Sequence, residues 1–80
     1  MKILSNEIFA QNLRNIRKKS GLSQEEVIAK LELMGSPLSR STYSLIELGR
    51  NNIFASDLMG LQKIFNVPFE EFFKGISVER

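Results

Sequence analysis

A short polar segment near the middle of the chain carries the side chains best suited to hydrogen bonding with a partner. Arg40 and Ser41 come directly after Ser39, and Ser44 and Leu45 follow three and four residues after Ser41. Residues spaced by three or four positions share one face of a helix. A helix here would therefore present a guanidinium, two hydroxyl groups and one aliphatic side chain together. The pattern favours a surface that recognises a partner.

The composition narrows the range of functions. The 80 residues include no Cys and no His, which excludes disulfides and thiolate metal sites and removes the commonest general base and metal ligand. No paired carboxylates mark a pocket either, so we expect no enzyme, no cofactor and no small-molecule substrate. The longest apolar runs are three residues, far too short to cross a membrane. We therefore expect a cytoplasmic protein without a membrane partner.

The charged residues are distributed unevenly along the chain. The net charge is +2, but the first 50 residues contain eight Lys or Arg against five Asp or Glu, and the last 30 contain three against four. A basic N-terminal part is compatible with nucleic-acid binding and equally with an ordinary solvated surface. Charge alone leaves both interpretations open.

The apolar spacing predicts five short helices in a single domain over residues 1–80, and no segment alternates as a strand would. The expected helices cover about residues 6–20, 23–34, 40–48, 55–65 and 68–74, with 76–80 as a loose tail. Ser23 and Glu26 have the spacing of a capping box at the start of the second helix, and Ser5 is a candidate cap for the first. The fourth helix lacks a good cap residue, because Phe54 stands at that position.

Each expected helix has an apolar stripe that should face a common core. In the first four helices the stripes are Phe9, Leu13 and Ile16; Val27, Ile28, Leu31 and Met34; Tyr43 and Ile46; and Leu58, Leu61, Ile64 and Phe65. The fifth helix carries Phe69, Phe72 and Phe73, which is more aromatic surface than one small core usually absorbs. We expect these phenylalanines mostly in the core, with one or two left for a dimer interface.

The second and third expected helices are consecutive in the chain, and together they offer a candidate surface for DNA. They are joined by a segment that contains Gly35, and the second of the pair presents the polar face that begins at Arg40. The major groove of DNA admits one helix, and its base edges offer donors and acceptors to Arg and to short polar side chains. The pattern therefore suits insertion of the second of these helices into the major groove, but many small helical bundles also expose a polar helix, so the pattern by itself does not decide the function.

Three segments resemble a known family. The runs IRKKSGLSQEEV (16–27), SRSTYSLIELGR (39–50) and LQKIFNVPFEEFF (61–73) are similar to the lambda-repressor-like, Cro/Xre-type helix-turn-helix proteins, and the resemblance covers about residues 8–74. It implies a compact, all-α, five-helix DNA-binding domain. The sequence departs from the family pattern in a longer connection over 32–38, in apolar Leu45 and Leu48 on the recognition helix, and in Phe54 where Thr or Ser is usual.

The resemblance also implies roles for individual residues. Those that would contact bases are Arg40, Ser41, Ser44 and Leu45, the last of them against a thymine methyl group. Those that would contact phosphates are Ser23, Gln24, Ser39, Thr42, Arg50 and Asn51. Arg17 and Glu47 match an ion pair that ties the first helix to the recognition helix.

Two functions remain in consideration. The first is a sequence-specific transcriptional regulator, repressor-like, that binds a palindromic operator in double-stranded DNA as a homodimer. The second is a protein-interaction module on the same fold, such as an antitoxin-like or adaptor subunit, with Leu45, Leu48 and the Phe-rich end as its working surface. Binding that weakens steeply with salt would favour the first.

Overall fold

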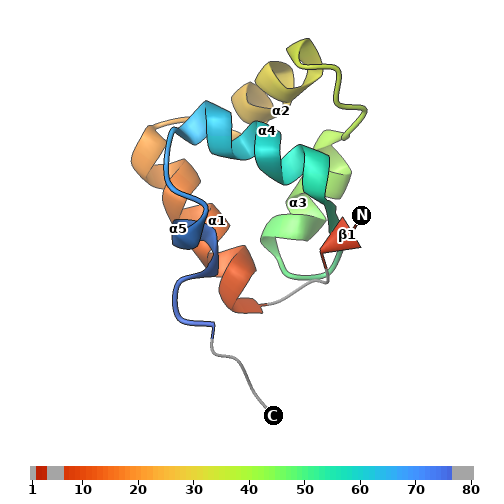
Figure 1. Cartoon of the computed structure of the whole chain (residues 1–80). Coiled ribbons are helices and arrows are strands. Elements are labelled where there is room, and N and C mark those ends of the chain that lie inside the picture. The colour runs from red at the N-terminus through yellow and green to blue at the C-terminus, as the bar shows by residue number, and fades with distance from the viewer. Residues whose placement is uncertain (1, 4–6, 77–80) are drawn as a thin grey trace.

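The structure is a computed structural model, which describes residues 2–3 and 7–76 of the chain. In chain order it contains strand β1 (Lys2–Ile3), helices α1 (Glu7–Ser20), α2 (Gln24–Leu33) and α3 (Arg40–Glu47), strand β2 (Ile53–Phe54), and helices α4 (Ala55–Phe65) and α5 (Glu70–Phe73). Figure 1 shows α4 lying across the front of the molecule and α5 beside α1. The expected all-α, five-helix fold is confirmed.

One core holds the five helices together. Its fully buried members include one residue from each helix: Leu13 of α1, Leu31 of α2, Tyr43 of α3, Leu61 of α4 and Phe72 of α5. Helix α1 packs against α3, α4 and α5, and α2 packs against α3 and α4. Because burial of apolar side chains is the main favourable contribution to folding, this shared core fixes how α2 and α3 lie relative to the other helices.

The two strands are a feature that no sequence pattern indicated. They pair antiparallel, with Lys2 opposite Phe54 and Ile3 opposite Ile53. Strands of two residues are too short for the alternation that identifies a strand in a sequence. The pairing joins the start of the chain to the segment between α3 and α4. The candidate cap Ser5 lies outside the described residues.

The bounds of α2 and α5 differ from the expectation. Helix α2 ends at Leu33, and Met34 is its C-cap, exposed to solvent rather than part of the buried stripe. Helix α5 has four residues, Glu70–Phe73, instead of the expected 68–74. The Asn12 side-chain amide of α1 donates to the carbonyl oxygens of Phe72 (3.0 Å) and Lys74 (2.8 Å), so it binds backbone acceptors at the end of this short helix. A contact from another helix thus contributes to the end of α5.

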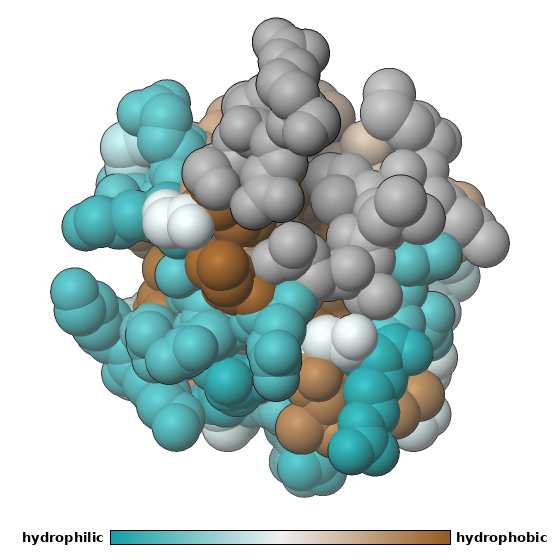
Figure 2. All heavy atoms as spheres, turned by 90° about the horizontal axis from the view of Figure 1, so that it is seen from below, coloured by the Kyte–Doolittle hydropathy of each residue, from teal (hydrophilic) through white to brown (hydrophobic). Residues whose placement is uncertain are grey.

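The expected loose tail is wrong at its first residue. Ile76 packs against the core, and its backbone N–H donates to the Phe73 carbonyl oxygen (3.1 Å). Residues 77–80 lie outside the described part of the chain. Seen from below, the described surface is mainly hydrophilic, with apolar atoms in small separate areas (Figure 2). Among the described residues, no helix has the length and apolar character needed to cross a membrane.

Candidate nucleic-acid interface

Helix α3 exposes one face and buries the other. The Ser39 hydroxyl caps its first turn by accepting a hydrogen bond from the Thr42 backbone N–H (3.2 Å). Tyr43, Ile46 and Glu47 are buried against the core. The opposite face consists of the residues expected to face DNA, and there Arg40, Ser41, Leu45 and Leu48 are exposed and Ser44 is half-buried. The amphipathic sequence of α3 therefore directs its polar first turn and two leucines outward.

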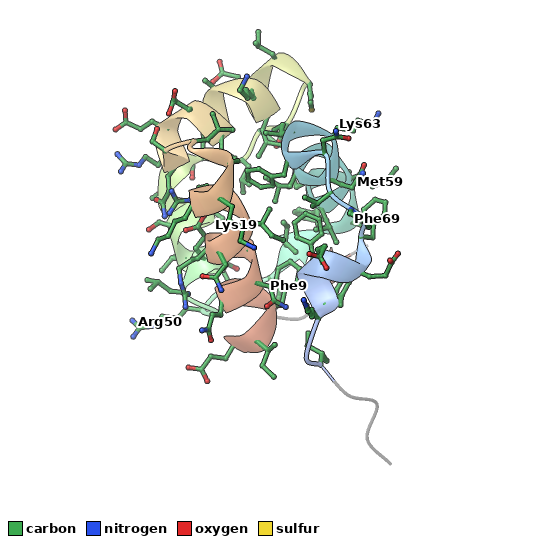
Figure 3. All side chains as sticks on the ribbon, turned by 90° about the vertical axis from the view of Figure 1, so that its left-hand side faces the viewer. Phe9, Lys19, Arg50, Met59, Lys63 and Phe69 are labelled. Atoms are coloured by element: carbon green, nitrogen blue, oxygen red, sulfur yellow. The ribbon has the colours of Figure 1, made fainter. Side chains whose placement is uncertain are left out.

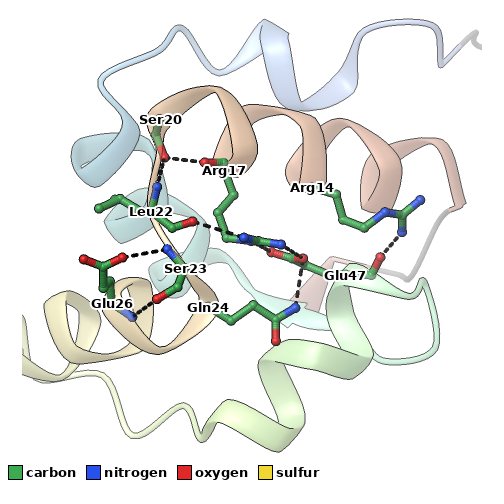
Figure 4. Close-up of polar contacts among 8 residues, drawn as sticks. All are labelled: Arg14, Arg17, Ser20, Leu22, Ser23, Gln24, Glu26 and Glu47. Carbon is green, nitrogen blue, oxygen red and sulfur yellow. Dashed lines mark hydrogen bonds and ion pairs between the residues drawn. The ribbon is translucent and has the colours of Figure 1, made fainter.

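A buried carboxylate fixes α3 to α1 and α2. Glu47 is 1% exposed, and its two carboxylate oxygens accept hydrogen bonds from Arg17 Nε (2.7 Å), Arg17 Nη2 (3.1 Å) and Gln24 Nε2 (3.0 Å) (Figure 4). Arg17 Nη1 also donates to the Leu22 carbonyl oxygen (3.1 Å), and Arg14 Nη1 donates to the Glu47 carbonyl oxygen. A planar guanidinium suits a carboxylate at two points, which fixes orientation as well as distance.

The charges in this network stabilise each other. Burial would raise the pKa of Glu47, but the hydrogen bonds and positive charge of Arg17, together with the neighbouring Tyr43 and Gln24 side chains, outweigh it and hold that pKa below the ordinary carboxyl range. The hydrogen bond to Glu47 in turn raises the pKa of Arg17. Both groups are therefore charged at neutral pH. Breaking a buried pair of this kind is costly, because the remaining charge loses its partner in a poorly solvated place.

Helix α2 begins with the expected capping box. The Ser23 hydroxyl accepts from the Glu26 backbone N–H (3.1 Å), and Glu26 Oε1 accepts from the Ser23 backbone N–H (2.9 Å). The hydrogen bond from the Ser23 backbone lowers the pKa of Glu26, so this carboxylate stays ionised well into the acid range. The first N–H groups of a helix have no partner within it and attract anions. The start of α2 thus offers backbone N–H groups to a phosphate, and Glu25 and Glu26 place two carboxylates in the same turn.

The long connection between α2 and α3 is tied to α4. Ser36 Oγ donates to Oδ1 of Asp57 (2.7 Å), a buried carboxylate in the first turn of α4, and also accepts from the Leu38 backbone N–H (3.2 Å). The Ser36 backbone N–H donates to the Leu31 carbonyl oxygen (3.1 Å). These contacts tie the connection to α4 and to the last turn of α2.

Removing this tie should destabilise the domain. Ser36→Ala leaves the buried Asp57 carboxylate without its hydroxyl donor, and we expect the free energy of unfolding to fall by roughly 1.5–3 kcal/mol, the usual range for a hydrogen bond to a charged group. Urea unfolding followed by circular dichroism measures this. The exposed serine of α4 provides the control, because Ser56→Ala should change stability by less than about 0.5 kcal/mol. Equal effects of the two substitutions would contradict the assignment.

A helix-turn-helix family model matches residues 13–72, three quarters of the chain, which include all of α2, α3 and α4 and parts of α1 and α5. The chain belongs to the helix-turn-helix family. Its class is the Cro/C1-type, Xre-like one, which confirms the resemblance seen in the sequence. The protein is therefore a DNA-binding helix-turn-helix regulator, from a family that is generally non-enzymatic. No curated protein matches the chain closely enough to be called a relative.

Within this helix-turn-helix, the loop after the recognition helix α3 turns sharply. Gly49 adopts a φ of +74°, a conformation that favours glycine, and the Arg50 backbone N–H donates to the Leu45 carbonyl oxygen (2.9 Å). Asn51 Oδ1 accepts from the Asn52 backbone N–H (2.9 Å) and so orders the next residues. Arg50 is exposed on the side of the molecule opposite Met59 and Phe69 (Figure 3).

Gln24 makes a contact that the sequence did not indicate. Because its Nε2 donates to Glu47, its side chain is oriented toward α3 inside the helix-turn-helix rather than directly toward solvent. A phosphate contact by Gln24 in this conformation would use its backbone N–H or the second hydrogen of the amide. Ser23, at the same helix start, is exposed.

Two charged residues at the helix-turn-helix were missed by the sequence reasoning. Arg14 completes the Glu47 network, and Glu25 forms an ion pair with Arg40, with Nη1 and Oε1 2.7 Å apart. Both contacts join different helices, so no local spacing indicated them. The position of Glu25 and Arg40 in the first turns of consecutive helices was the one available signal.

The three phenylalanines near the end of the helix-turn-helix domain separate into core and surface. Phe72 is fully buried and has no surface for a partner, so the expectation that it belongs to a dimer interface is wrong. Phe69 and Phe73 are 42% and 37% exposed. The ring of Phe73 lies 5.6 Å from that of Phe9, centroid to centroid. The expectation that one or two of the three remain for a partner therefore concerns Phe69 and Phe73 alone.

Proposed function

We propose that this protein is a repressor-like transcription regulator that binds a palindromic operator as a homodimer. The observation that carries the proposal is the exposed face of α3, which the buried Glu47 network holds in a fixed orientation to α1 and α2. Insertion of this face into the major groove would bring Arg40, Ser41 and Leu45 to the base edges. Arg40 would supply the strongest base contact, and Leu45 would meet a thymine methyl group.

Contacts to the DNA backbone would come from groups that flank α3 on both sides. Ser23 and the first N–H groups of α2 lie at one side, and Arg50 and Asn51 follow α3 in the chain. Ser39 and Thr42 would contact phosphate at the start of α3, where their hydroxyl oxygens lie 3.0 Å apart. Phosphate contacts of this kind fix position and supply most of the affinity, whereas base contacts determine sequence preference.

A dimer would place two copies of α3 about 34 Å apart, one helical turn of DNA, so that both enter the same face of the duplex. Phe69 lies on the side away from Arg50 (Figure 3), and a dimer formed there would turn the two recognition helices away from each other. Phe73, packed beside Phe9, is the aromatic residue that we assign to the dimer contact. This assignment rests on the partial exposure of Phe73.

The alternative function, a protein-interaction module, is supported by two exposed leucines, one on α3 and one at its C-cap. Leu45 is 41% exposed and Leu48 is 54% exposed. The salt dependence of DNA binding separates the two functions. A DNA-binding protein with several phosphate contacts should lose orders of magnitude in affinity between about 50 and about 200 mM salt, whereas apolar association should not. Binding that is absent, or insensitive to salt, would favour the interaction module.

Arg50→Ala should weaken binding to all DNA sequences by a similar factor. A phosphate contact carries no sequence information, so its loss lowers affinity uniformly and reduces the slope of log affinity against log salt by about one. Titration of a preferred and a scrambled duplex at several salt concentrations measures both quantities. If Arg50→Ala changes the preference between the two duplexes and leaves the slope intact, Arg50 contacts bases and the assignment is wrong.

A further inference from the structure

An exposed ion pair joins the first turns of α2 and α3. Arg40 is the first residue of α3, Glu25 is the second residue of α2, and Arg40 Nη1 lies 2.7 Å from Glu25 Oε1. The two side chains are 58% and 72% exposed. The pair therefore lies in solvent. It links the first turn of α2 to Arg40, the residue proposed to contact a base.

Stability does not account for this pair. Ion pairs between exposed side chains contribute little to folding, and salt screens them. Helices α2 and α3 are already joined by the buried contact between Gln24 and Glu47 and by the core. Arg40 also stands at the end of α3 where the helix dipole disfavours a cation. The helix itself therefore gains nothing from the charge of Arg40, and at the surface that charge is paired with the Glu25 carboxylate.

The geometry of the contact leaves Arg40 able to recognise a base. A guanidinium is planar and has five N–H donors, and Glu25 is hydrogen-bonded to Nη1. The edge formed by Nε and Nη2 remains for a partner, and two parallel donors match the O6 and N7 acceptors of guanine in the major groove. A long side chain held by a second residue also loses less rotational freedom when it binds.

The charge of Glu25 has the opposite effect on the phosphate backbone. It lies in the first turn of α2, next to the residues proposed to approach a phosphate. A carboxylate there repels the phosphate oxygens of any DNA sequence. At the preferred sequence, the contact between Arg40 and its base offsets this repulsion, and at other sequences it does not. Non-specific binding, which is almost entirely electrostatic, is therefore weakened more than binding to the preferred sequence.

We propose that Glu25 is a specificity-determining positioning residue, which orients Arg40 toward a guanine and opposes binding to other sequences. The inference rests on the proposed function, because it presupposes that α3 contacts bases. It adds a residue outside the recognition helix to those that determine sequence preference.

The test compares Glu25→Gln with a matched control on the same helix. Glu32→Gln removes the same charge from another exposed position of α2. Affinities are measured for a duplex enriched from a random pool by the wild-type protein and for a scrambled duplex. Glu25→Gln should lower the ratio of the two affinities by about fivefold to tenfold, within the range that one good base contact supplies, and should raise affinity for the scrambled duplex. Glu32→Gln should leave the ratio unchanged.

A second variant shows whether Glu25 acts through Arg40. In an Arg40→Ala background, Glu25→Gln should no longer change the ratio, because the side chain that Glu25 orients is gone. Replacing the contacted guanine with 7-deazaguanine, which lacks the N7 acceptor, should weaken binding by the wild type more than binding by Glu25→Gln. Circular dichroism melting checks that all variants are folded, as expected for exposed positions.

The outcomes distinguish this inference from the proposed function. A wild-type protein that binds both duplexes equally would overturn the proposed function, and this inference with it. Two other results would overturn the role of Glu25 alone, in a wild type that does prefer the enriched duplex. In the first, Glu25→Gln leaves the ratio of the two affinities unchanged. In the second, Glu25→Gln lowers that ratio equally with and without Arg40.

Discussion

Glu47→Ala should lower the free energy of unfolding by about 3–5 kcal/mol, the usual cost of breaking a buried ion pair by removing one partner. The substitution removes the carboxylate that binds Arg17 and the Gln24 amide, and it leaves Arg17 charged at a site where its side chain is 14% exposed. A domain of 80 residues is stabilised by roughly 4–12 kcal/mol in total. Much of that stability would be lost. Urea unfolding followed by circular dichroism measures it.

A double variant separates the charge from the packing. Arg17→Met combined with Glu47→Leu removes both charges and keeps apolar volume, so it should recover most of the stability lost in Glu47→Ala. Glu71→Ala, at an exposed position of α5, is the control and should change stability by less than about 0.5 kcal/mol. A loss below about 1 kcal/mol for Glu47→Ala would contradict the importance given to this network.

The same network makes stability depend on pH. The pKa of Glu47 is lower in the folded protein than its ordinary value, so the unfolded chain binds protons more readily at this site. The contribution of Glu47 is therefore complete above about pH 5 and is lost as the pH falls through the carboxyl range near 4 and below. Wild-type stability should decline over this range more steeply than that of the Arg17→Met/Glu47→Leu variant.

Arg40→Ala should weaken binding to the preferred duplex by roughly 1–3 kcal/mol and relax the preference at one base position. The reason is the loss of a paired donor to a base edge, which no neighbouring side chain replaces. Affinities for a set of duplexes with single base changes measure both effects.

The control for Arg40 is Lys63→Ala. Lys63 is an exposed cation of α4 that lies on the far side of the molecule from Arg50 (Figure 3), so its removal should affect all duplexes little and equally. Should Arg40→Ala behave like Lys63→Ala, or weaken every duplex by one common factor, Arg40 does not contact a base.

Local sequence signals predicted the helices well. The bounds of α4 were expected at about 55–65 and lie at Ala55–Phe65, because its apolar stripe is strong and ends before Pro68. The capping pair Ser23 and Glu26 located the start of α2. Signals of this kind act within a few residues of the chain, so a single sequence contains them in full.

Contacts between distant segments could not be derived from the residues in the same way. The pairing of β1 with β2, the Asn12 contacts at the end of α5 and the tie between Ser36 and Asp57 each join residues more than 20 positions apart. Their partners depend on the packing of the whole core. The Arg17–Glu47 pair was predicted only because a family resemblance supplied the long-range information that spacing lacks.

The face of α3 is a mixed case. Its amphipathic pattern predicted which residues are exposed, and the structure places Arg40, Ser41 and Leu45 on the outer surface. The pattern could not show that Arg40 meets Glu25 or that Gln24 is bound to Glu47, because both contacts depend on the angle between α2 and α3. That angle is a property of the packed core.

Selection of bound duplexes from a random pool tests most directly whether α3 reads a DNA sequence. The wild-type protein should enrich one motif made of two inverted half-sites, with centres about 10 base pairs apart. A variant with Arg40, Ser41 and Leu45 all changed to Ala should enrich none, although it still binds DNA at low salt. If the wild type enriches no motif, or the triple variant enriches the same one, the exposed face of α3 is not the surface that recognises DNA.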